Sequence, residues 1–225
     1  KNPVNPDLAL WLGGIERLYT AGIKNLGAIH RGFSTYEKTK YRNTPEWQLA
    51  IEFQNNFPDL PLINDPSHIT GNRDMIQEVS QTALDLNFDG LMIETHFDPA
   101  NAWSDAAQQV TPTKLKSIME DLTIKKLTDT TASYREPLES LRAQINVVDD
   151  QLIDLLGKRM QVADKIGGLK KEQNVAVLQS RRWNEILGNM VLEGDSKGLS
   201  EEFILKLFKA IHQESINHQE KIING

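Results

Sequence analysis

The chain has 225 residues, of which 39% are hydrophobic and 25% charged, and its formal net charge is −6. The longest apolar runs have about five residues, far fewer than the roughly 20 of a membrane-spanning helix, and no secretory leader opens the sequence, so we expect a cytoplasmic protein without a membrane partner. The absence of Cys excludes disulfides, thiolate zinc sites and cysteine nucleophiles, and the excess of acidic residues argues against nucleic-acid binding.

The first half of the chain alternates strand-like and helical segments. Three strands are predicted at Leu26–His30, Leu62–Asp65 and Leu91–Thr95, and the stretches before them carry apolar residues at helical spacing. Strands about 30–35 residues apart with one helix between them are typical of βαβ units. In such folds the chemistry collects where strands end, and a polar cluster follows each of these three strands.

The polar clusters contain a candidate metal site. His68 and Glu94 follow neighbouring strands and Asp105 lies in the next loop. One imidazole and two carboxylates suit a divalent ion such as Mn²⁺ or Fe²⁺. The alternative is that these residues only cap their segments. His30 and His96 stand beside the same loops, and we expect them to support the site.

The second half is predicted to be entirely helical. Residues 123–136 indicate a linker, and Pro137 favours a helix start. We therefore expect domains at 1–122 and 137–225. Two further helices are expected at about Ser180–Val191 and Ser200–Ile223, separated by Gly194–Gly198. The first helix is long and needs a packing partner, because an apolar stripe at spacings of three and four runs through Leu138, Leu141, Ile145, Val148, Leu152, Leu155, Val162 and Ile166.

Polar residues interrupt the apolar faces of these helices. Arg182 shares a face with Leu178, Ile186 and Met190, and Ser215 and Gln219 continue the line of Ile204, Phe208 and Ile211. Arg159 and Lys170 share a face, whereas Arg142 lies roughly 100° around the helix axis, so a second copy of the helix would bring it to the same pocket.

Buried cations are costly unless anions pair with them, and no acidic residues share these faces. The pattern predicts a small dicarboxylate ligand. The alternatives are arginines that extend to solvent and polar side chains that bond to nearby backbone.

Residues 137 to about 225 resemble the all-helical chorismate mutase family. The resemblance is carried by two sequence motifs, LxxLRxxINVVDDQLIDLLGKR and LFxxIxxESxxxQ, and by Lys170 and Arg182, which lie between them. The resemblance implies a cofactor-free rearrangement of chorismate to prephenate in a homodimer. It implies that Arg142 binds a substrate carboxylate in the partner's site and Arg159 one in its own chain. Lys170 and Gln219 would bind the ether oxygen, with Arg182 and Ser215 completing the wall. Gln179 and Trp183 stand where the family usually offers acidic residues to the substrate hydroxyl.

Residues 1 to about 122 resemble the β-type class of DAHP synthases. The resemblance is carried by four sequence motifs: KNPVNPD, IHRGFSTYEKTKYRN, NDPSHITGNRD and IETHFDPxxAWSDAAQQ. Those enzymes condense phosphoenolpyruvate with erythrose 4-phosphate in a (β/α)₈ barrel. The resemblance implies that His68, Glu94 and Asp105 are metal ligands and that Lys1 and Arg31 bind phosphoenolpyruvate. The family's first strands, its Cys ligand and its Lys-Pro-Arg-Thr segment have no counterpart in this sequence, so we do not expect residues 1–225 alone to form DAHP.

The expected fold is α/β plus all-α: the C-terminal part of a (β/α)₈ TIM barrel, followed by a three-helix domain that pairs as an intertwined dimer. The expected function is a bifunctional enzyme of the shikimate pathway for aromatic amino acids. One alternative is that the helical domain mainly senses prephenate or chorismate and regulates the barrel allosterically. Another is a helical dimerisation domain without a ligand.

Overall fold

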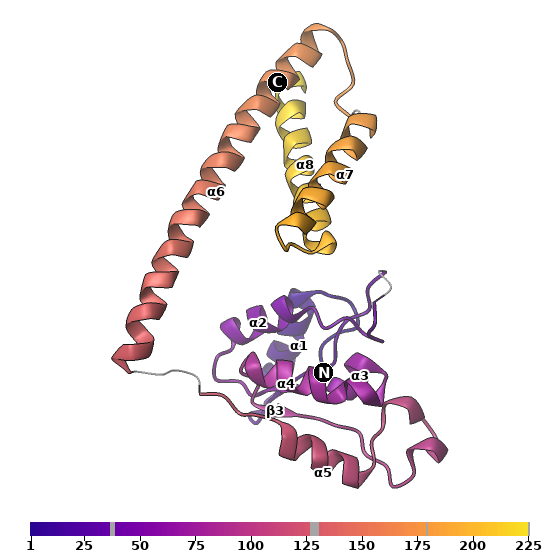
Figure 1. Cartoon of the computed structure of the whole chain (residues 1–225). Helices are drawn as coiled ribbons and strands as arrows, with labels where there is room; N and C mark the ends of the chain where they lie inside the picture. The colour runs from indigo at the N-terminus through magenta and orange to yellow at the C-terminus, as the bar shows by residue number, and fades with distance from the viewer. Residues whose placement is uncertain (37–38, 127–130, 179, 225) are drawn as a thin grey trace. The chain divides into compact units, whose positions relative to one another are not determined.

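The computed structural model describes residues 1–36, 39–126, 131–178 and 180–224, and the chain forms two compact units, Lys1–Asp129 and Thr130–Gly225 (Figure 1). We call them the N-terminal unit and the helical unit. The first mixes strands and helices, and the described part of the second contains helices alone. The predicted combination of an α/β region with an all-α region is confirmed. Within the described residues, no helix is long and apolar enough to cross a membrane.

The N-terminal unit is built on a three-stranded parallel sheet. Its strands β1 (Ala28–His30), β2 (Leu62–Asn64) and β3 (Gly90–Leu91) are hydrogen-bonded in that order, with His30 opposite Asn64 and Asn64 opposite Leu91. Helices lie before, between and after the strands: α1 (Leu8–Thr20), α2 (Trp47–Asn56), α3 (Pro66–Thr70), α4 (Ile76–Asp85) and α5 (Pro112–Asp121). Three short 3₁₀ helices complete the unit: η1 (Arg73–Met75), η2 (Pro99–Asn101) and η3 (Ala106–Gln108).

The strands lie where the sequence predicts them, but they are shorter. β2 ends before Asp65 because the side chain of Asp65 caps α3, accepting a hydrogen bond from the His68 backbone N–H at 3.1 Å. The predicted strand Leu91–Thr95 is wrong beyond Leu91, where only Thr95 forms an isolated parallel bridge, to Val110. One reason is that the Glu94 N–H bonds to the Ser67 hydroxyl at 3.0 Å instead of to a strand.

An aromatic core packs against one side of β1 and includes His30. Trp11 stacks on Phe53 with ring centroids 4.1 Å apart, and His30 contacts Trp11, Phe33, Trp47 and Phe88. His30 is fully buried; its Nε2 lies 2.6 Å from the Pro45 carbonyl and its Nδ1 lies 3.0 Å from the Asn64 amide nitrogen. Burial lowers the pKa of His30 to about 4. The expectation that His30 supports the metal site is therefore wrong, because its ring belongs to the core.

The helical unit consists of α6 (Ala132–Glu172), α7 (Ser180–Ser196) and α8 (Glu201–Asn224). The predicted helix start at Pro137 is wrong, because α6 begins at Ala132 and carries Pro137 inside it. The first turn is closed by Tyr134 and Arg135, whose N–H groups both bond to the Thr131 carbonyl, and Pro137 removes a single later hydrogen bond. The predicted break at Gly194–Gly198 is also displaced, since α7 continues through Gly194 to Ser196.

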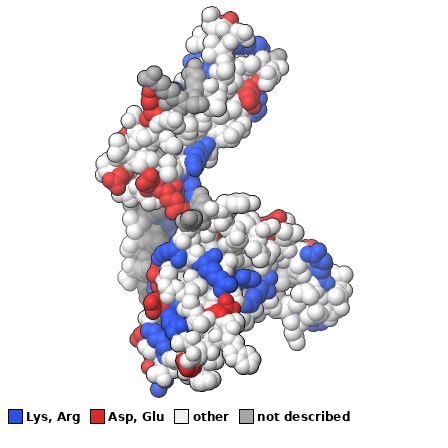
Figure 2. Space-filling view, turned by 90° about the vertical axis from the view of Figure 1, so that its right-hand side faces the viewer, with Lys and Arg blue, Asp and Glu red and all other residues white. Residues whose placement is uncertain are grey.

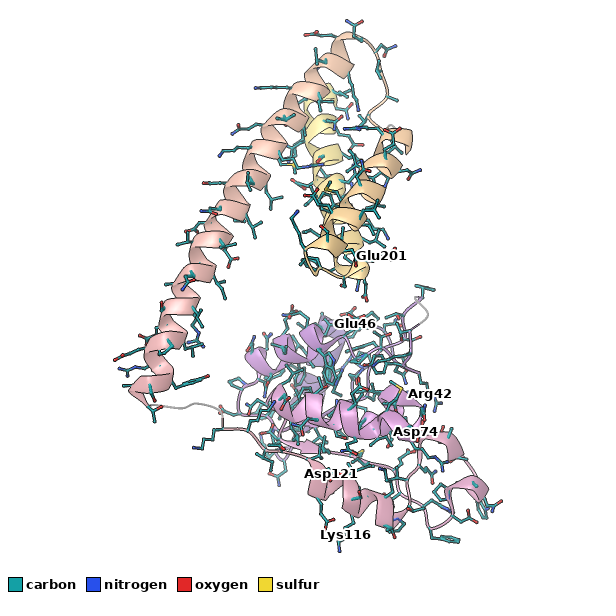
Figure 3. All side chains as sticks on the ribbon, in the orientation of Figure 1. Arg42, Glu46, Asp74, Lys116, Asp121 and Glu201 are labelled. Atoms are coloured by element: carbon teal, nitrogen blue, oxygen red, sulfur yellow. The ribbon has the colours of Figure 1, made fainter. Side chains whose placement is uncertain are left out.

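The two halves of α6 have different surroundings within this unit. The C-terminal half packs against α8 (Figure 1), and Ala163 and Gly167 are buried there. A Cβ atom at Gly167 would lie 3.0 Å from the Gln219 Cα, so glycine permits this close approach. Side chains of the N-terminal half project from a ribbon that α7 and α8 do not cover (Figures 1 and 3). Its apolar stripe is exposed: Leu141 56%, Ile145 58%, Val148 54%, Leu152 52% and Leu155 61%.

Candidate active sites in the two units

The ends of β2 and β3 bring together the three predicted metal ligands. His68 lies on α3, Glu94 follows β3, and Asp105 precedes η3. Each offers one ligand atom, and these three atoms lie within 4.8 Å of one another. The Nε2 atom of His68 is 3.6 Å from Oε1 of Glu94. A nitrogen donor with two carboxylates fits a divalent ion such as Mn²⁺ or Fe²⁺.

The predicted anion-binding residue Lys1 lies next to this group through Asp65. The Asp65 side chain is fully buried; its Oδ1 is 3.0 Å from His68 Nδ1, and its Oδ2 accepts a hydrogen bond from Lys1 Nζ at 2.7 Å. A carboxylate on the second ring nitrogen fixes the orientation of a ligating histidine. The Arg31 backbone N–H donates to the Asn2 side chain at 2.6 Å, which ties Arg31 to the segment that carries Lys1.

Two residues that the sequence analysis missed join the carboxylates of the metal group. Gln108 donates to Oε2 of Glu94 at 2.8 Å, and Arg42 donates to both Gln108 Oε1 and Asp105 Oδ1 at 2.7 Å. The Arg42 guanidinium holds the pKa of Asp105 below its usual range. Asp105 has a left-handed backbone, with φ of 49°, which Asp adopts more readily than most residues.

The remaining neighbour, His96, is half-buried and lies beside these loops. Its Nδ1 accepts a hydrogen bond from the Asp98 N–H at 3.0 Å, and its ring stacks on Phe97. Several Lys and Arg side chains lie on one face of the N-terminal unit, with Asp and Glu side chains between and beside them (lower part of Figure 2).

The helical unit encloses a cavity of about 270 Å³ between its three helices. Its lining combines cationic, polar and apolar side chains: Arg159, Val162, Ala163, Ile166, Lys170, Val177, Arg182, Trp183, Ile186, His212, Ser215, Ile216 and Gln219. The sequence therefore predicted most of its polar wall. Arg142 is exposed on the other half of α6 and does not line this cavity. Gln179 lies outside the described residues.

Two of the three cations that line the cavity, Arg159 and Lys170, are held by neutral oxygens. Arg159 donates to the Ser215 hydroxyl, and Lys170 donates to the Val177 carbonyl and, at 2.9 Å, to Gln219 Oε1. Burial lowers the pKa of Arg159 and of Lys170, and in the described part of the chain neither is paired with a carboxylate. Arg182 is more exposed and lies 3.7 Å from Glu185. Such a cavity is suited to an anion that supplies the missing negative charge.

One wall of the cavity is an aromatic pair. The rings of Trp183 and His212 stack in parallel, with centroids 3.9 Å apart. Burial and the charges of Arg159 and Lys170 lower the pKa of His212, which favours the neutral ring. The sequence analysis missed His212, which directly follows Ile211 on α8, since the apolar line that it traced passes through Ile211 to Ser215.

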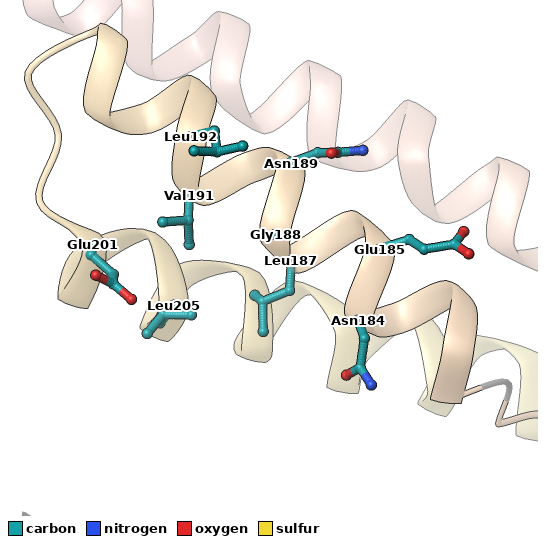
Figure 4. Close-up of a pocket in the computed structure, with 9 residues that line it drawn as sticks. All are labelled: Asn184, Glu185, Leu187, Gly188, Asn189, Val191, Leu192, Glu201 and Leu205. Atoms are coloured by element: carbon teal, nitrogen blue, oxygen red, sulfur yellow. The ribbon is translucent and has the colours of Figure 1, made fainter.

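A larger hollow, of about 620 Å³, lies between α7 and α8 (Figure 4). Its polar groups are the amides of Asn184 and Asn189 and the carboxylates of Glu185 and Glu201, among leucines and Val191. Among the described residues, no Lys or Arg lines it. Because an anion placed there would meet carboxylates instead of cations, the smaller cavity is the better candidate for a dianion.

Comparison with known proteins finds two families in succession. A model of the DAHP synthetase I family matches residues 7–131, and a model of chorismate mutase type II matches residues 141–220. A phospho-2-dehydro-3-deoxyheptonate aldolase of Thermotoga maritima is 31% identical over 114 residues, 51% of this chain and 32% of the relative. A bifunctional chorismate mutase/prephenate dehydratase of Buchnera aphidicola subsp. Acyrthosiphon pisum is 32% identical over 82 residues, 36% of this chain and 21% of the relative.

The solved structure of a truncated form of 3-deoxy-D-arabino-heptulosonate 7-phosphate synthase from Thermotoga maritima is 27% identical in sequence. The match covers 51% of this chain and 43% of that chain, with a TM-score of 0.47. The chain thus spans about a third of the length of one curated relative and about a fifth of the other.

Proposed function

The chain belongs to the DAHP synthetase I family over residues 7–131, and because a chorismate mutase type II segment follows at 141–220, we propose that it is a bifunctional enzyme of the shikimate pathway. The helical unit converts chorismate to prephenate. The N-terminal unit is the C-terminal part of a (β/α)₈ barrel that condenses phosphoenolpyruvate with erythrose 4-phosphate. We place the boundary between the two domains within the predicted linker of residues 123–136, since α6 begins at Ala132 and belongs to the helical unit. We place the enzyme in the cytoplasm, where phosphoenolpyruvate is produced.

The observation that carries the mutase proposal is a cavity in which two half-buried cations, Arg159 and Lys170, have no carboxylate partner among the described residues. Chorismate is a dianion with one carboxylate on the ring and one on the enolpyruvyl chain. We propose that Arg159 and Arg182 each hold a carboxylate, so that the flexible substrate is kept in the compact conformer in which its reacting carbons meet. The apolar side chains of Val162, Ile166 and Ile186 exclude water from the ring.

Lys170 and Gln219 are the proposed donors to the ether oxygen. Negative charge develops on this oxygen as the C–O bond breaks, and fixed donors stabilise it without further reorganisation. The existing contact between Lys170 Nζ and Gln219 Oε1, at 2.9 Å, keeps both side chains together and orients the amide so that its NH₂ group points away from Lys170. Trp183 and His212 supply a flat wall against the ring in place of an acidic partner for the substrate hydroxyl.

We further propose that two chains pair through the N-terminal half of α6. The apolar stripe of this half runs over several turns of the helix, and its side chains are more than half exposed. Exposed apolar surface of this extent indicates an interface with another chain. Arg142 lies on this half of α6, and in the dimer it would reach a substrate carboxylate in the partner's cavity. The proposed dimer therefore completes each site with a residue from the other chain.

For the barrel, we propose that His68, Glu94 and Asp105 bind a divalent ion such as Mn²⁺. When bound, the ion supplies a Lewis acid that polarises the carbonyl group of the sugar phosphate. Lys1 and Arg31 would hold the phosphate and carboxylate of phosphoenolpyruvate, as Lys and Arg commonly do. The buried carboxylate of Asp65 supports this role, because it fixes both Lys1 and His68.

The test of the mutase proposal is the substitution Lys170→Ala. Loss of one preorganised donor commonly costs about 10²–10³ in rate, so we expect that loss in kcat for chorismate. Lys171→Ala is the matched control, because Lys171 is exposed, donates to the Ile222 carbonyl at 2.9 Å and does not line the cavity. Turnover of Lys170→Ala close to that of Lys171→Ala would refute the assigned site.

A further inference from the structure

Both carboxylates of the metal group belong to one hydrogen-bond network, with Gln108 bonded to Glu94 and Arg42 bonded to Asp105. Gln108 is 1% exposed, and its amide has a partner at each end. The Nε2 atom donates to Glu94 Oε2 at 2.8 Å, and Oε1 accepts from Arg42 at 2.7 Å. Since the same Arg42 nitrogen also donates to Asp105 Oδ1 at 2.7 Å, an unbroken series of hydrogen bonds runs from Glu94 to Asp105.

The amide group suits this position because it donates and accepts at once. By occupying Oε2 of Glu94, Gln108 leaves Oε1 turned toward His68 Nε2, at 3.6 Å, where an ion would be shared. Arg42 in turn occupies Oδ1 of Asp105. Neither ligand could rotate about its carboxyl bond without breaking one of these hydrogen bonds, so the network limits how each oxygen can be presented.

The segment that carries Gln108 is itself fixed from two sides. Arg73 donates to the carbonyl oxygens of Ala106 and Ala107, directly before Gln108. Arg42 packs against Gly71, where a Cβ atom would lie 2.7 Å from the Arg42 Cβ, so the close contact needs glycine. Both ends of the network therefore rest on backbone that has little freedom to shift.

We propose that Gln108 is a positioning residue of the metal site, which orients Glu94 directly and Asp105 through Arg42 and thereby sets the affinity for the ion and the symmetry of its coordination. This inference rests on the proposed function only in requiring a divalent ion at His68, Glu94 and Asp105. Gln108 does not contact the ion or the substrates. Its contribution is the orientation of two carboxylates that would otherwise each have several arrangements of similar energy.

The test is Gln108→Met in the full chain, which keeps the volume of the side chain and removes both hydrogen bonds. Mn²⁺ binding is followed by electron paramagnetic resonance, which reports the free ion and the symmetry around the bound ion. Loss of such an outer contact typically weakens metal affinity about 10–100-fold, and we expect that loss with an altered zero-field splitting of the bound Mn²⁺. The matched control is Gln109→Met, since Gln109 donates to the Ser104 carbonyl, at 2.8 Å, and not to either carboxylate.

Circular dichroism and urea unfolding establish that each variant is folded. If Gln108→Met does not fold, Gln108→Asn keeps the amide but is one methylene too short to bridge Glu94 and Arg42, and the same loss is expected. The positioning role would be overturned if the folded variant bound Mn²⁺ within about twofold of the parental affinity while His68→Ala lost binding. That result would still support the metal site itself. Parent-like Mn²⁺ binding by His68→Ala would overturn the site itself, and the inference with it.

Discussion

Acidification should destabilise the N-terminal unit through one core residue, His30. The neutral ring is fully satisfied: Nε2 donates to the Pro45 carbonyl and Nδ1 accepts from the Asn64 amide. A proton added to Nδ1 would meet the hydrogen atoms of that amide, and the new charge would be buried among aromatic rings. Protonation therefore favours the unfolded chain, in which the ring is hydrated.

The size of the effect follows from the pKa of His30, which burial lowers from 6.5 to about 4. Because the folded-state pKa is the lower one, the contribution to stability is fully present above pH 6.5 and is lost as pH falls toward 4. At about 1.4 kcal/mol for each pKa unit, the loss in the free energy of unfolding is about 3 kcal/mol. Stability should change little further from this residue below pH 4.

Urea unfolding followed by tryptophan fluorescence measures this loss, since Trp11 and Trp47 contact His30. Carboxylates also titrate in this range, so the comparison is with His30→Gln, in which they are unchanged. The parent should be more stable than the variant at pH 7, and the difference in unfolding free energy should shrink by about 3 kcal/mol by pH 4. A difference that stays constant with pH would show that protonation of His30 does not destabilise the folded unit.

Two further predictions concern the helical unit. Arg142→Ala and Arg159→Ala should each lose chorismate turnover, but mixing the two variants in equal amounts should restore about a quarter of the parental activity. Random subunit exchange makes about half of the dimers mixed, and a mixed dimer has one intact site of two; no recovery after subunit exchange would contradict the shared site. Gly167→Ala should lower the unfolding free energy by about 1–3 kcal/mol through overpacking, since the new Cβ would lie 3.0 Å from Gln219 Cα. Gly168→Ala, with open space at its Cβ, should instead raise it by about 0.5–1 kcal/mol, and urea unfolding that ranks the two variants the other way would contradict the packing.

The sequence predicts those parts of the fold that follow from periodicity. Apolar spacing located the strands of the N-terminal unit and the helices of the helical unit, and the strand ends located His68 and Glu94. Helix and strand ends were less predictable, because caps and local hydrogen bonds decide them. Asp65, for example, ends β2 by bonding to the His68 N–H.

The contacts between loops and between helices could not be predicted in this way. Arg42 belongs to an irregular segment and Gln108 to the single turn of η3, and in both the direction of the side chain depends on tertiary packing and not on a repeat. Trp183 and His212 meet because α7 and α8 pack in one particular register, and the pattern of either helix alone does not fix that register. Arg42, Gln108, Trp183 and His212 all lie within or beside the sequence motifs that resemble the two families. These motifs, and not the apolar periodicity, are therefore the feature of the sequence that could have pointed to them.

In the proposed mechanism, the cations of the α6–α8 cavity bind and rearrange a dianion without a metal. The most direct measurement is the consumption of chorismate by this chain, followed by ultraviolet absorbance, with and without a chelator. We predict turnover that the chelator leaves unchanged and that Lys170→Ala removes. Absence of turnover, or turnover that the chelator abolishes, would exclude a metal-free mutase site in this cavity.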